Sequence, residues 1–508
     1  MAETYNIPMG IGVIIALVIF FIVGFAMLYL VRRSGKRFII AGKQLPFFLV
    51  GTMLLAQALD ANATLGNAGG VYSAGFFAGF QFPLGLALCL VVVGIWFAKP
   101  LNRMNLLTLP DFYYRRFNRP TEVVSAFLMV VSFIILVAGN LAGAAWILST
   151  LFPISFMWAL VAMASLIFLY TLAGGLFACA STDIIQIYPA LLAFVTGVLW
   201  MLIAYGGWSY FSGAIPAGYF DFSGLTSLEN GAMLNWGGIL ALAIGDVVAL
   251  DFAERVFAAK SPEVAQKSCF YGAGFVILIG ICASVFGLMA FKLLPAGIED
   301  YRMVLPMLAT GYMPFAAGLF IMIGVVAAGL STADGGMLGV SAVVGRNFIQ
   351  RNILKVWKKE YTPEERASLD SKLLIITRLM GIPVMAITVA LAWYKPEPGI
   401  MLVLAFDVVF AGCLVPITLG LYWKKANAYG ALSGMIAGTL LRAAFFFPMA
   451  SPLIPLPEYL WGLDTMVSPV FSLLVMVPVC LLTQKQDPPK HEVIYETPDD
   501  VAVLSTKY

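Results

Sequence analysis

The chain has 508 residues, of which 61% are hydrophobic and only 11% are charged, with a formal net charge of +3. This composition excludes an ordinary soluble globular protein, in which about a quarter of the residues are charged. The small positive charge also gives no basic footprint of the kind that nucleic-acid-binding proteins carry. We therefore expect lipid bilayer, and not nucleic acid, as a partner.

Apolar runs that are long enough to cross a bilayer recur along the whole chain. A transmembrane helix needs about 20 mainly apolar residues. The sequence predicts an all-α integral membrane protein with about 13 transmembrane helices, multi-pass in the cell (plasma or inner) membrane. The runs cover residues 9–31, 47–72, 76–98, 123–148, 153–173, 183–205, 233–256, 270–294, 314–345, 374–394, 398–422, 428–448 and 466–483.

Basic residues gather in alternate loops between these runs. Lys and Arg are frequent in residues 32–43, 99–119, 255–267 and 346–372, whereas residues 206–232 contain neither. Cytoplasmic loops of membrane proteins carry an excess of Lys and Arg. This pattern predicts a cytoplasmic position for the basic loops, with the N-terminus outside and the C-terminus in the cytoplasm.

Two of the predicted spans are interrupted by short polar residues and glycines. Residues 54–70 contain Asp60 and Asn62, and residues 233–256 contain Asp246 and Asp251. Broken helices at corresponding places in two halves of a carrier are typical of inverted repeats with a binding site near the bilayer midplane.

A third polar group interrupts the run at 314–345, where Ser331 and Thr332 are followed by Asp334. An acid at membrane depth costs about 2.5–3.5 kcal/mol on insertion scales, which favours a functional role. Paired hydroxyls offer hard oxygen ligands for a small cation such as sodium. The alternative is hydrogen bonding between helices, for which Ser and Thr are commonly used.

Other chemistries have little support in the sequence. The Gly-x-x-x-x-Gly-Lys-Ser/Thr loop of ATP-driven pumps does not occur, and the single histidine, His491, lies in the polar tail. The six cysteines lie in or beside apolar runs without a Cys-x-x-Cys pair. We expect a carrier or channel driven by a gradient, without a cofactor and without enzymatic activity.

Five segments in order along the chain resemble motifs of the sodium/solute symporter family, which has the inverted-repeat fold of the LeuT type. The resemblance spans about residues 35–440 and implies a core of five plus five helices. The segments are TLPDF at 108–112, YTLAGG at 170–175 with TDIIQ at 182–186, RVFAAKS at 255–261, AAGLSTAD at 327–334 and GLYWKK at 420–425.

The resemblance also implies how the chain is organised. It divides into an extra N-terminal helix and cytoplasmic loop, a first repeat, an extracellular loop, a second repeat, accessory helices and a cytoplasmic tail. The expected boundaries, in that order, are 1–45, 46–205, 206–232, 233–425, 426–484 and 485–508.

A sodium site is implied between the first broken helix and the eighth core helix. Its ligands are the backbone carbonyls of Ala56, Leu59 and Ala328 and the hydroxyls of Ser331 and Thr332. Five oxygens without a carboxylate suit the reversible binding of a coupling ion. Asp183 and Asp334 match positions for a second sodium ion or its exit path, although Gly335 lacks the hydroxyl that some relatives use.

The predicted solute is a small organic molecule, with an amine-bearing or zwitterionic compound favoured. Asp60 has no basic partner nearby in the sequence, so it could bind an ammonium group. Alternatively, Asp60 is protonated or bonded to backbone donors that the helix break frees. A carboxylate, sugar or other neutral solute, a sodium-independent uniporter and a transporter-like sensor stay open. The predicted solute-binding residues are Asp60, Asn62, Asp246, Asp251 and Asn140.

Overall fold

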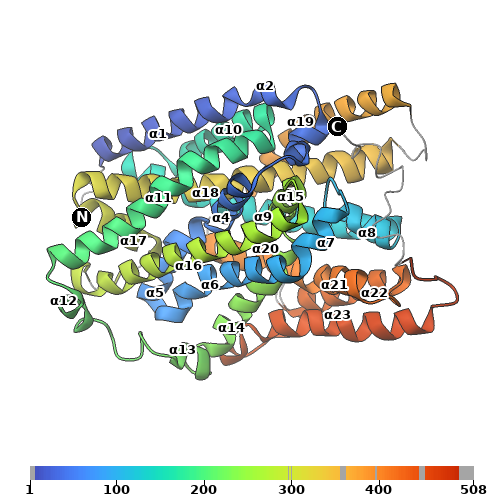
Figure 1. The fold of residues 1–508 in the computed structure, drawn as a ribbon. Coiled ribbons are helices and arrows are strands. Elements are labelled where there is room, and N and C mark those ends of the chain that lie inside the picture. Colours follow the sequence, from blue (N-terminus) through green and yellow to red (C-terminus); the bar gives the residue numbers. More distant parts are fainter. Residues whose placement is uncertain are drawn as a thin grey trace.

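The computed structural model describes residues 6–295, 297–298, 300–354, 362–394, 398–445 and 452–490. The part of the predicted tail at 491–508, with His491, lies outside the described residues. Helices run side by side along one common direction (Figure 1). The described β-structure is one isolated parallel bridge between Leu45 and Ala259. The all-α fold is confirmed.

Nine helical segments in the described part of the chain are long and apolar enough to cross a membrane. They match nine of the predicted runs because a continuous apolar run is the main signal for a membrane helix. The segments are α1 (Ile7–Ala26) with α2 (Leu28–Val31), α6 (Phe76–Val92) with η3 (Val93–Phe97) and α7 (Ala98–Arg103), α9 (Arg119–Leu151), α10 (Phe156–Gly174), α11 (Leu176–Ala204), α16 (Pro262–Leu293), α18 (Phe315–Val343) with η7 (Val344–Ile353), α19 (Pro363–Tyr394) and α23 (Leu463–Leu482).

Three more spans are helix pairs that bend at a break by 58°, 46° and 44°, which raises the count to as many as 12 in the described residues. The first two bends lie where polar residues and glycines interrupt the sequence. The pairs are α4 (Phe47–Ala58) with η2 (Asn62–Gly66) and α5 (Asn67–Ala74), α14 (Ala232–Leu240) with η4 (Ala241–Gly245), η5 (Asp246–Val248) and α15 (Leu250–Ala258), and α20 (Pro398–Gly412) with α21 (Leu414–Tyr422).

The remaining predicted run, 428–448, forms α22 (Ala428–Phe445). It contains Arg442 and several glycines, and it is not among the up to 12 candidate spans of the described residues. The expected number of about 13 spans and the orientation of the termini therefore stay predictions, as do the boundaries of the two repeats.

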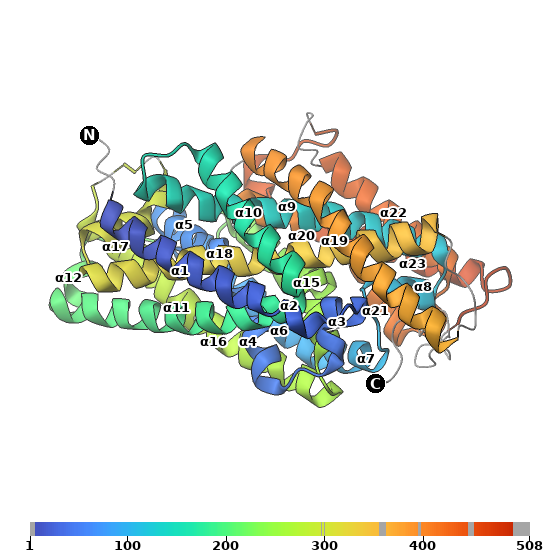
Figure 2. The ribbon, with the colours of Figure 1, turned by 90° about the horizontal axis from the view of Figure 1, so that it is seen from above.

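Connecting elements gather at the two ends of the helix bundle. Figure 1 shows α12, α13 and α17 toward one end and α7 and α8 toward the other, and Figure 2 places α3 with the second group. The second end holds the basic loops, so the charge pattern predicts that it faces the cytoplasm. The short elements are α3 (Gly35–Ile40), η1 (Ala41–Lys43), α8 (Pro110–Arg116), α12 (Trp208–Ser212), α13 (Ser223–Thr226), η6 (Tyr301–Met303), α17 (Val304–Gly311) and η8 (Glu458–Leu460).

Among the nine unbroken spans of the described residues, α18 is the most enclosed, since its apolar window is 67% buried, whereas that of α1 is only 22% buried. α18 packs against α9, α11, α19 and α4, and α1 lies against α10 and α11. A buried span that carries Ser331, Thr332 and Asp334 can hold polar side chains away from lipid. The polar group of α18 is thus set inside the bundle, and the predicted extra helix α1 covers its flank.

Candidate sodium and solute site

The first helix break is held open by two polar side chains. The Oδ1 atom of Asp60 accepts hydrogen bonds from the backbone amides of Asn62 at 2.9 Å and Ala63 at 2.8 Å. Asn140 on α9 accepts from the amide of Ala61 at 3.1 Å. Buried backbone donors need such partners where a helix is interrupted. Asp60 and Asn140 thus cap the second half of the broken span.

The two hydroxyls of α18 meet the end of α4. Ser331 Oγ donates to the carbonyl of Ala56 at 3.0 Å, and Thr332 Oγ1 lies 3.2 Å from the carbonyl of Gln57. Both hydroxyls also lie within hydrogen-bond distance of the Ala328 carbonyl, at 3.2 and 3.3 Å. Four of the five expected sodium ligands therefore converge. They are hard, uncharged oxygens, and such a set fits sodium.

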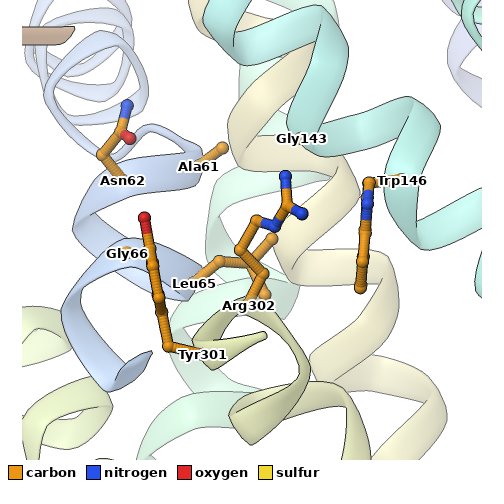
Figure 3. A pocket seen from close by; sticks show the side chains of 8 residues that line it. All are labelled: Ala61, Asn62, Leu65, Gly66, Gly143, Trp146, Tyr301 and Arg302. Atoms are coloured by element: carbon orange, nitrogen blue, oxygen red, sulfur yellow. The ribbon is translucent and has the colours of Figure 1, made fainter. Parts of the chain in front are cut away.

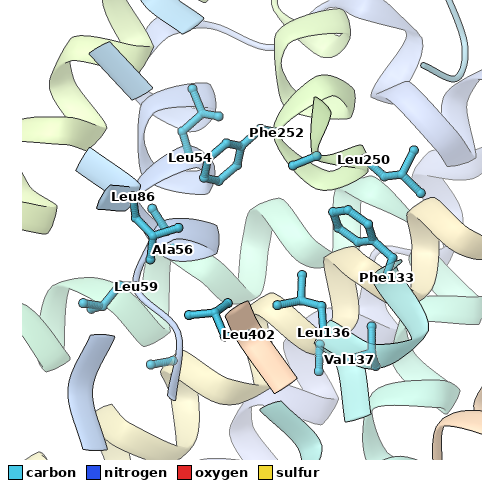
Figure 4. Close-up of a cluster of buried hydrophobic side chains, with 14 of the residues drawn as sticks. Leu54, Ala56, Leu59, Leu86, Phe133, Leu136, Val137, Leu250, Phe252 and Leu402 are labelled. Carbon is cyan, nitrogen blue, oxygen red and sulfur yellow. The ribbon is translucent and has the colours of Figure 1, made fainter. Parts of the chain in front are cut away.

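The fifth expected ligand, Leu59, ends the same helix. Its carbonyl makes no hydrogen bond to Ser331 or Thr332 among the contacts of the described residues. Apolar side chains of α4, α6, α9, α15 and α20 surround this region (Figure 4). Such surroundings strengthen polar interactions inside them. The cluster includes Leu54, Ala56, Leu59, Leu86, Phe133, Leu136, Val137, Leu250, Phe252 and Leu402.

The two acids expected near a second cation lie on packed helices. Asp334 on α18 accepts a hydrogen bond from the Tyr170 hydroxyl of α10 at 2.7 Å. Asp183 on α11 is fully buried, and neither of its carboxylate oxygens has a hydrogen-bond partner in the described part of the chain. α11 packs against α18. The arrangement leaves polar oxygens of Asp183 available to a cation or a proton.

The second helix break carries the other two predicted acids. Asp251 lies in the first turn of α15, where its Oδ1 atom accepts from the amide of Phe252 at 2.7 Å. Arg255 bonds the backbone carbonyl of Asp251 at 3.2 Å and pairs with Glu254 at 3.5 Å. Asp246 differs, because its buried Oδ1 atom has no hydrogen-bond partner among the described residues.

A small cavity adjoins the first break on the side of η6 (Figure 3). Its volume is about 10 Å³, enough for one water molecule at most. The guanidinium of Arg302 lies 4.7 Å from the centre of the Trp146 ring and pairs with Asp300 at 2.8 Å. The lining residues are Ala61, Asn62, Leu65, Gly66, Gly143, Trp146, Tyr301 and Arg302.

Among the lining residues, Asn62 alone was predicted for the site. Its Nδ2 atom donates to Asp60 at 2.7 Å, and its buried Oδ1 atom has no partner within the described residues. Trp146, Tyr301 and Arg302 were not predicted because single aromatic and basic residues near span ends are common at membrane interfaces. The structure brings them to the break from α9 and η6.

A pair of hydroxyls contacts one bent span, and a second bent span lies in the other half of the chain. This is the arrangement that the family motifs imply. A model of the "Sodium:solute symporter family" matches residues 38–438. The chain belongs to the sodium:solute symporter family. It is therefore a multi-pass membrane transporter that couples sodium to a small solute, and not an enzyme.

Named relatives carry different solutes. The chain is 26% identical over 470 residues to a sodium/glucose cotransporter of Vibrio parahaemolyticus, covering 83% of this chain and 81% of the relative. It is 26% identical to a sodium/pantothenate symporter of Haemophilus influenzae (85% and 89% covered) and 23% identical to the human high affinity choline transporter 1 (88% and 79%). Membership in the family thus leaves the solute open.

The fold is also similar to a solved structure. A sodium-coupled sialic acid symporter, in a substrate-bound outward-open state, superposes with a TM-score of 0.74 at 17% identity, covering 94% of this chain and 97% of the other. At this identity the likeness concerns the fold. It agrees with the LeuT-type architecture expected from the motifs.

Proposed function

We propose that this symporter imports an amine-bearing or zwitterionic solute with sodium by alternating access, and that sodium binds at Ala56, Leu59, Ala328, Ser331 and Thr332. The observation that carries the ion site is that Ser331 Oγ reaches the carbonyls of Ala56 and Ala328, at 3.0 and 3.2 Å, and that Thr332 Oγ1 reaches the Ala328 carbonyl at 3.3 Å. These oxygens come from a bent span and from the most enclosed of the unbroken spans. An ion held by both would join two elements that can move relative to each other.

Sodium binding requires the hydroxyl hydrogen bonds to reorganise. Ser331 and Thr332 point their protons at carbonyl oxygens that belong to the same proposed ligand set, or to Gln57. A bound cation replaces these contacts with ion–oxygen contacts. The cation then favours the conformation in which the carbonyls of α4 and the hydroxyls of α18 turn toward the ion, since a ligand shifts an equilibrium toward the state that it binds better. We assign that conformation to the outward-open form, which completes the solute site.

One sodium ion supplies enough energy for accumulation. One charge that crosses 100 mV yields about 2.3 kcal/mol, and a tenfold sodium gradient adds about 1.4 kcal/mol. Together these terms support an accumulation of a neutral solute of several hundredfold. A second ion at Asp183 and Asp334 is therefore not required for uptake.

The preference for an amine rests on the acids at the two breaks. Asp246 keeps a buried carboxylate oxygen without a protein donor among the described residues, which a cationic group could occupy. Asp251, Asn62 and Asn140 stay as neighbouring candidates. A carboxylate or sugar solute and a sensor role are the alternatives, and the assay below separates them.

The decisive test is uptake into proteoliposomes with and without an inward sodium gradient, across amines, amino acids, sugars and carboxylates. We expect sodium-dependent accumulation of an amine or amino acid. Uptake that does not depend on sodium would indicate a uniporter. Solute binding without any uptake would favour the sensor.

The sodium site is tested with Ser331→Ala and Thr332→Ala. Loss of one ligand should raise the sodium concentration for half-maximal uptake by about tenfold or more. This is the effect expected when a contact with the free energy of one hydrogen bond is lost. Ser341→Ala is the matched control, because Ser341 is a buried hydroxyl of the same helix whose Oγ has no partner in the described chain. An equal effect of all three substitutions would contradict the site.

A further inference from the structure

Gln57 makes two cross-helix contacts beside the proposed sodium site. Its side chain is buried, with a residue exposure of 2%. The Nε2 atom donates to the backbone carbonyl of Ser331 at 2.6 Å. The backbone carbonyl of Gln57 accepts from Thr332 Oγ1 at 3.2 Å. One residue of α4 therefore contacts both hydroxyl-bearing residues of α18.

Sodium binding would affect the contact of the Gln57 side-chain amide differently from the contacts of the Ser331 and Thr332 hydroxyls. The Ser331–Ala56 and Thr332–Gln57 hydrogen bonds use the hydroxyl oxygens that we assign to sodium. Those bonds must reorganise when the ion binds. The bond from Gln57 Nε2 to the Ser331 carbonyl uses neither hydroxyl oxygen, and the Ser331 carbonyl is outside the proposed ligand set. It therefore does not have to break when sodium binds, and it can add to the hold that a bound ion has on the two helices.

The other end of the Gln57 side chain and the Arg255 guanidinium both approach Gly335 of α18. A Cβ atom placed on Gly335 would lie 2.5 Å from Gln57 Oε1 and 2.5 Å from Arg255 Nη2. Both atoms are buried and lack a hydrogen-bond partner in the described part of the chain. One is an acceptor and the other a donor, so they are chemically complementary. The missing side chain of Gly335 is what allows both to approach α18 at the same point.

Arg255 belongs to the inner half of the second bent span. Its Nη1 atom donates to the carbonyl of Asp251 at 3.2 Å and lies 3.5 Å from Glu254, all on α15. α15 packs against both α4 and α18. The Gln57 side chain therefore lies between the proposed ion site and the second broken span.

We propose that Gln57 is a positioning residue that braces the sodium site and relays its occupancy to Arg255 on α15. This inference rests on the sodium coupling and ion site proposed above. The Nε2 atom fixes α4 to α18, and the Oε1 atom faces the guanidinium of Arg255 across Gly335. A bound sodium ion holds α4 against α18. The side-chain amide of Gln57 then stays in the position from which it can hold Arg255 and with it α15. Loss of the ion loosens both bent spans together.

The test replaces Gln57 with Leu, which keeps similar bulk but neither donates nor accepts hydrogen bonds. We expect the sodium concentration for half-maximal uptake, measured at saturating solute, to rise by about tenfold, as for the loss of one buried hydrogen bond. The solute KM at saturating sodium should be little changed. A general structural defect would instead lower the maximal rate at every sodium concentration.

Gly335→Ala supplies a second, independent variant. Its methyl group would displace Arg255 Nη2 and Gln57 Oε1, so its sodium response should shift in the same direction. The matched control is Gly336→Ala, whose methyl group would meet only the side chains of Val137 and Phe133. We expect no shift in sodium dependence for this control.

The outcomes separate this inference from the proposed ion site. If Ser331→Ala shifts the sodium dependence but neither Gln57→Leu nor Gly335→Ala does, the positioning role is overturned and the ion site stands. If Ser331→Ala has no effect, the ion site itself fails. If Gln57→Leu does not yield folded protein by size-exclusion chromatography, the result for Gly335→Ala decides, and an unchanged sodium dependence in that variant overturns the proposal.

Discussion

At the first helix break, three backbone amides lose their helical acceptors, and Asp60 and Asn140 provide new ones. The second oxygen of Asp60 is taken by the side chain of Asn62. A carboxylate that recognises a cationic solute has to keep an acceptor open for it. Asp60 and Asp246 both lie at helix breaks in the sequence, but their surroundings differ. Asp60 bonds the backbone donors that the break frees, which was the alternative to solute binding. Asp246 keeps a carboxylate oxygen that can still accept a hydrogen bond.

Replacing Asp246 with Asn should therefore raise the KM for an amine solute by about 10- to 100-fold, the range expected for a hydrogen bond to a charged group. The melting temperature should stay close to that of the parent. Asp60→Asn is the matched control, because its single oxygen can still accept from the amides of Asn62 and Ala63. Uptake kinetics and thermal unfolding measure both effects. Loss of amine uptake in Asp60→Asn alone would reverse the two roles.

Among the connecting elements, α8 is tied to η7, which continues α18, by a buried group of charges. Asp111 on α8 lies 2.8 Å from Arg346 Nε and 3.0 Å from Arg351 Nη1, and Arg351 also pairs with Glu122 at 2.7 Å. Burial alone would raise the pKa of Asp111, but the two guanidinium groups hold this pKa below its ordinary value. The ion group thus fastens a short helix to a long span.

Asp111→Asn should lower the free energy of unfolding by about 3–5 kcal/mol at pH 7, because it leaves a buried charge without its partner. A carboxyl with a lowered pKa stabilises the fold above its unfolded pKa, and this contribution is lost as the pH falls through the folded pKa. The stability difference between parent and variant should therefore shrink below about pH 4. Thermal unfolding across pH measures it, with exposed Asp221→Asn as the control. A difference that does not depend on pH would contradict the ionic explanation.

The elements of this fold differ in how well the sequence predicts them. Long apolar runs predict the spans. The breaks at Asp60 and Asp246 are also predictable, because polar residues and glycines interrupt such runs. The bend between α20 and α21 has a signal that hydropathy does not show, because Pro416 has no amide hydrogen to bond the Gly412 carbonyl four residues earlier. The π-helical segments, such as η2, likewise have no signal in hydropathy.

The candidate site is predictable only where a motif carries it. Ser331 and Thr332 lie in such a motif, and so the contact of Ser331 with Ala56, 275 positions away, could be expected from the resemblance. The contacts of Gln57 and Arg302 depend on how distant helices pack. That packing follows from the whole set of side chains and is not visible in one sequence.

For the whole molecule, the narrow cavity at the first break indicates a conformation closed on the side of η6. Tyr301 lies against α5, since a Cβ atom on Gly69 would meet its carbonyl at 2.5 Å. Arg302 covers the Trp146 ring at 4.7 Å and is held by both oxygens of Asp300 at 2.8 Å. The charge pattern predicts that this end faces the outside of the cell. The Arg302–Trp146 contact is thus one of the contacts that close the outer path.

Arg302→Ala should open this path more often. A cation–π contact contributes about 0.5–2 kcal/mol, so its loss should raise the open population by about 2- to 30-fold. The measurement is labelling of Ala61→Cys, at a position that lines the cavity, by a membrane-impermeant maleimide added outside in sodium-free buffer. The native cysteines are all buried. Lys292→Ala is the matched control, because Lys292 makes a cation–π contact with Tyr210 at 5.2 Å but does not line the cavity. Faster labelling with Arg302→Ala and not with Lys292→Ala identifies Arg302 as a residue that keeps the outer path closed. Equal labelling rates in both variants would show that closure depends on the packing of η6 against α5.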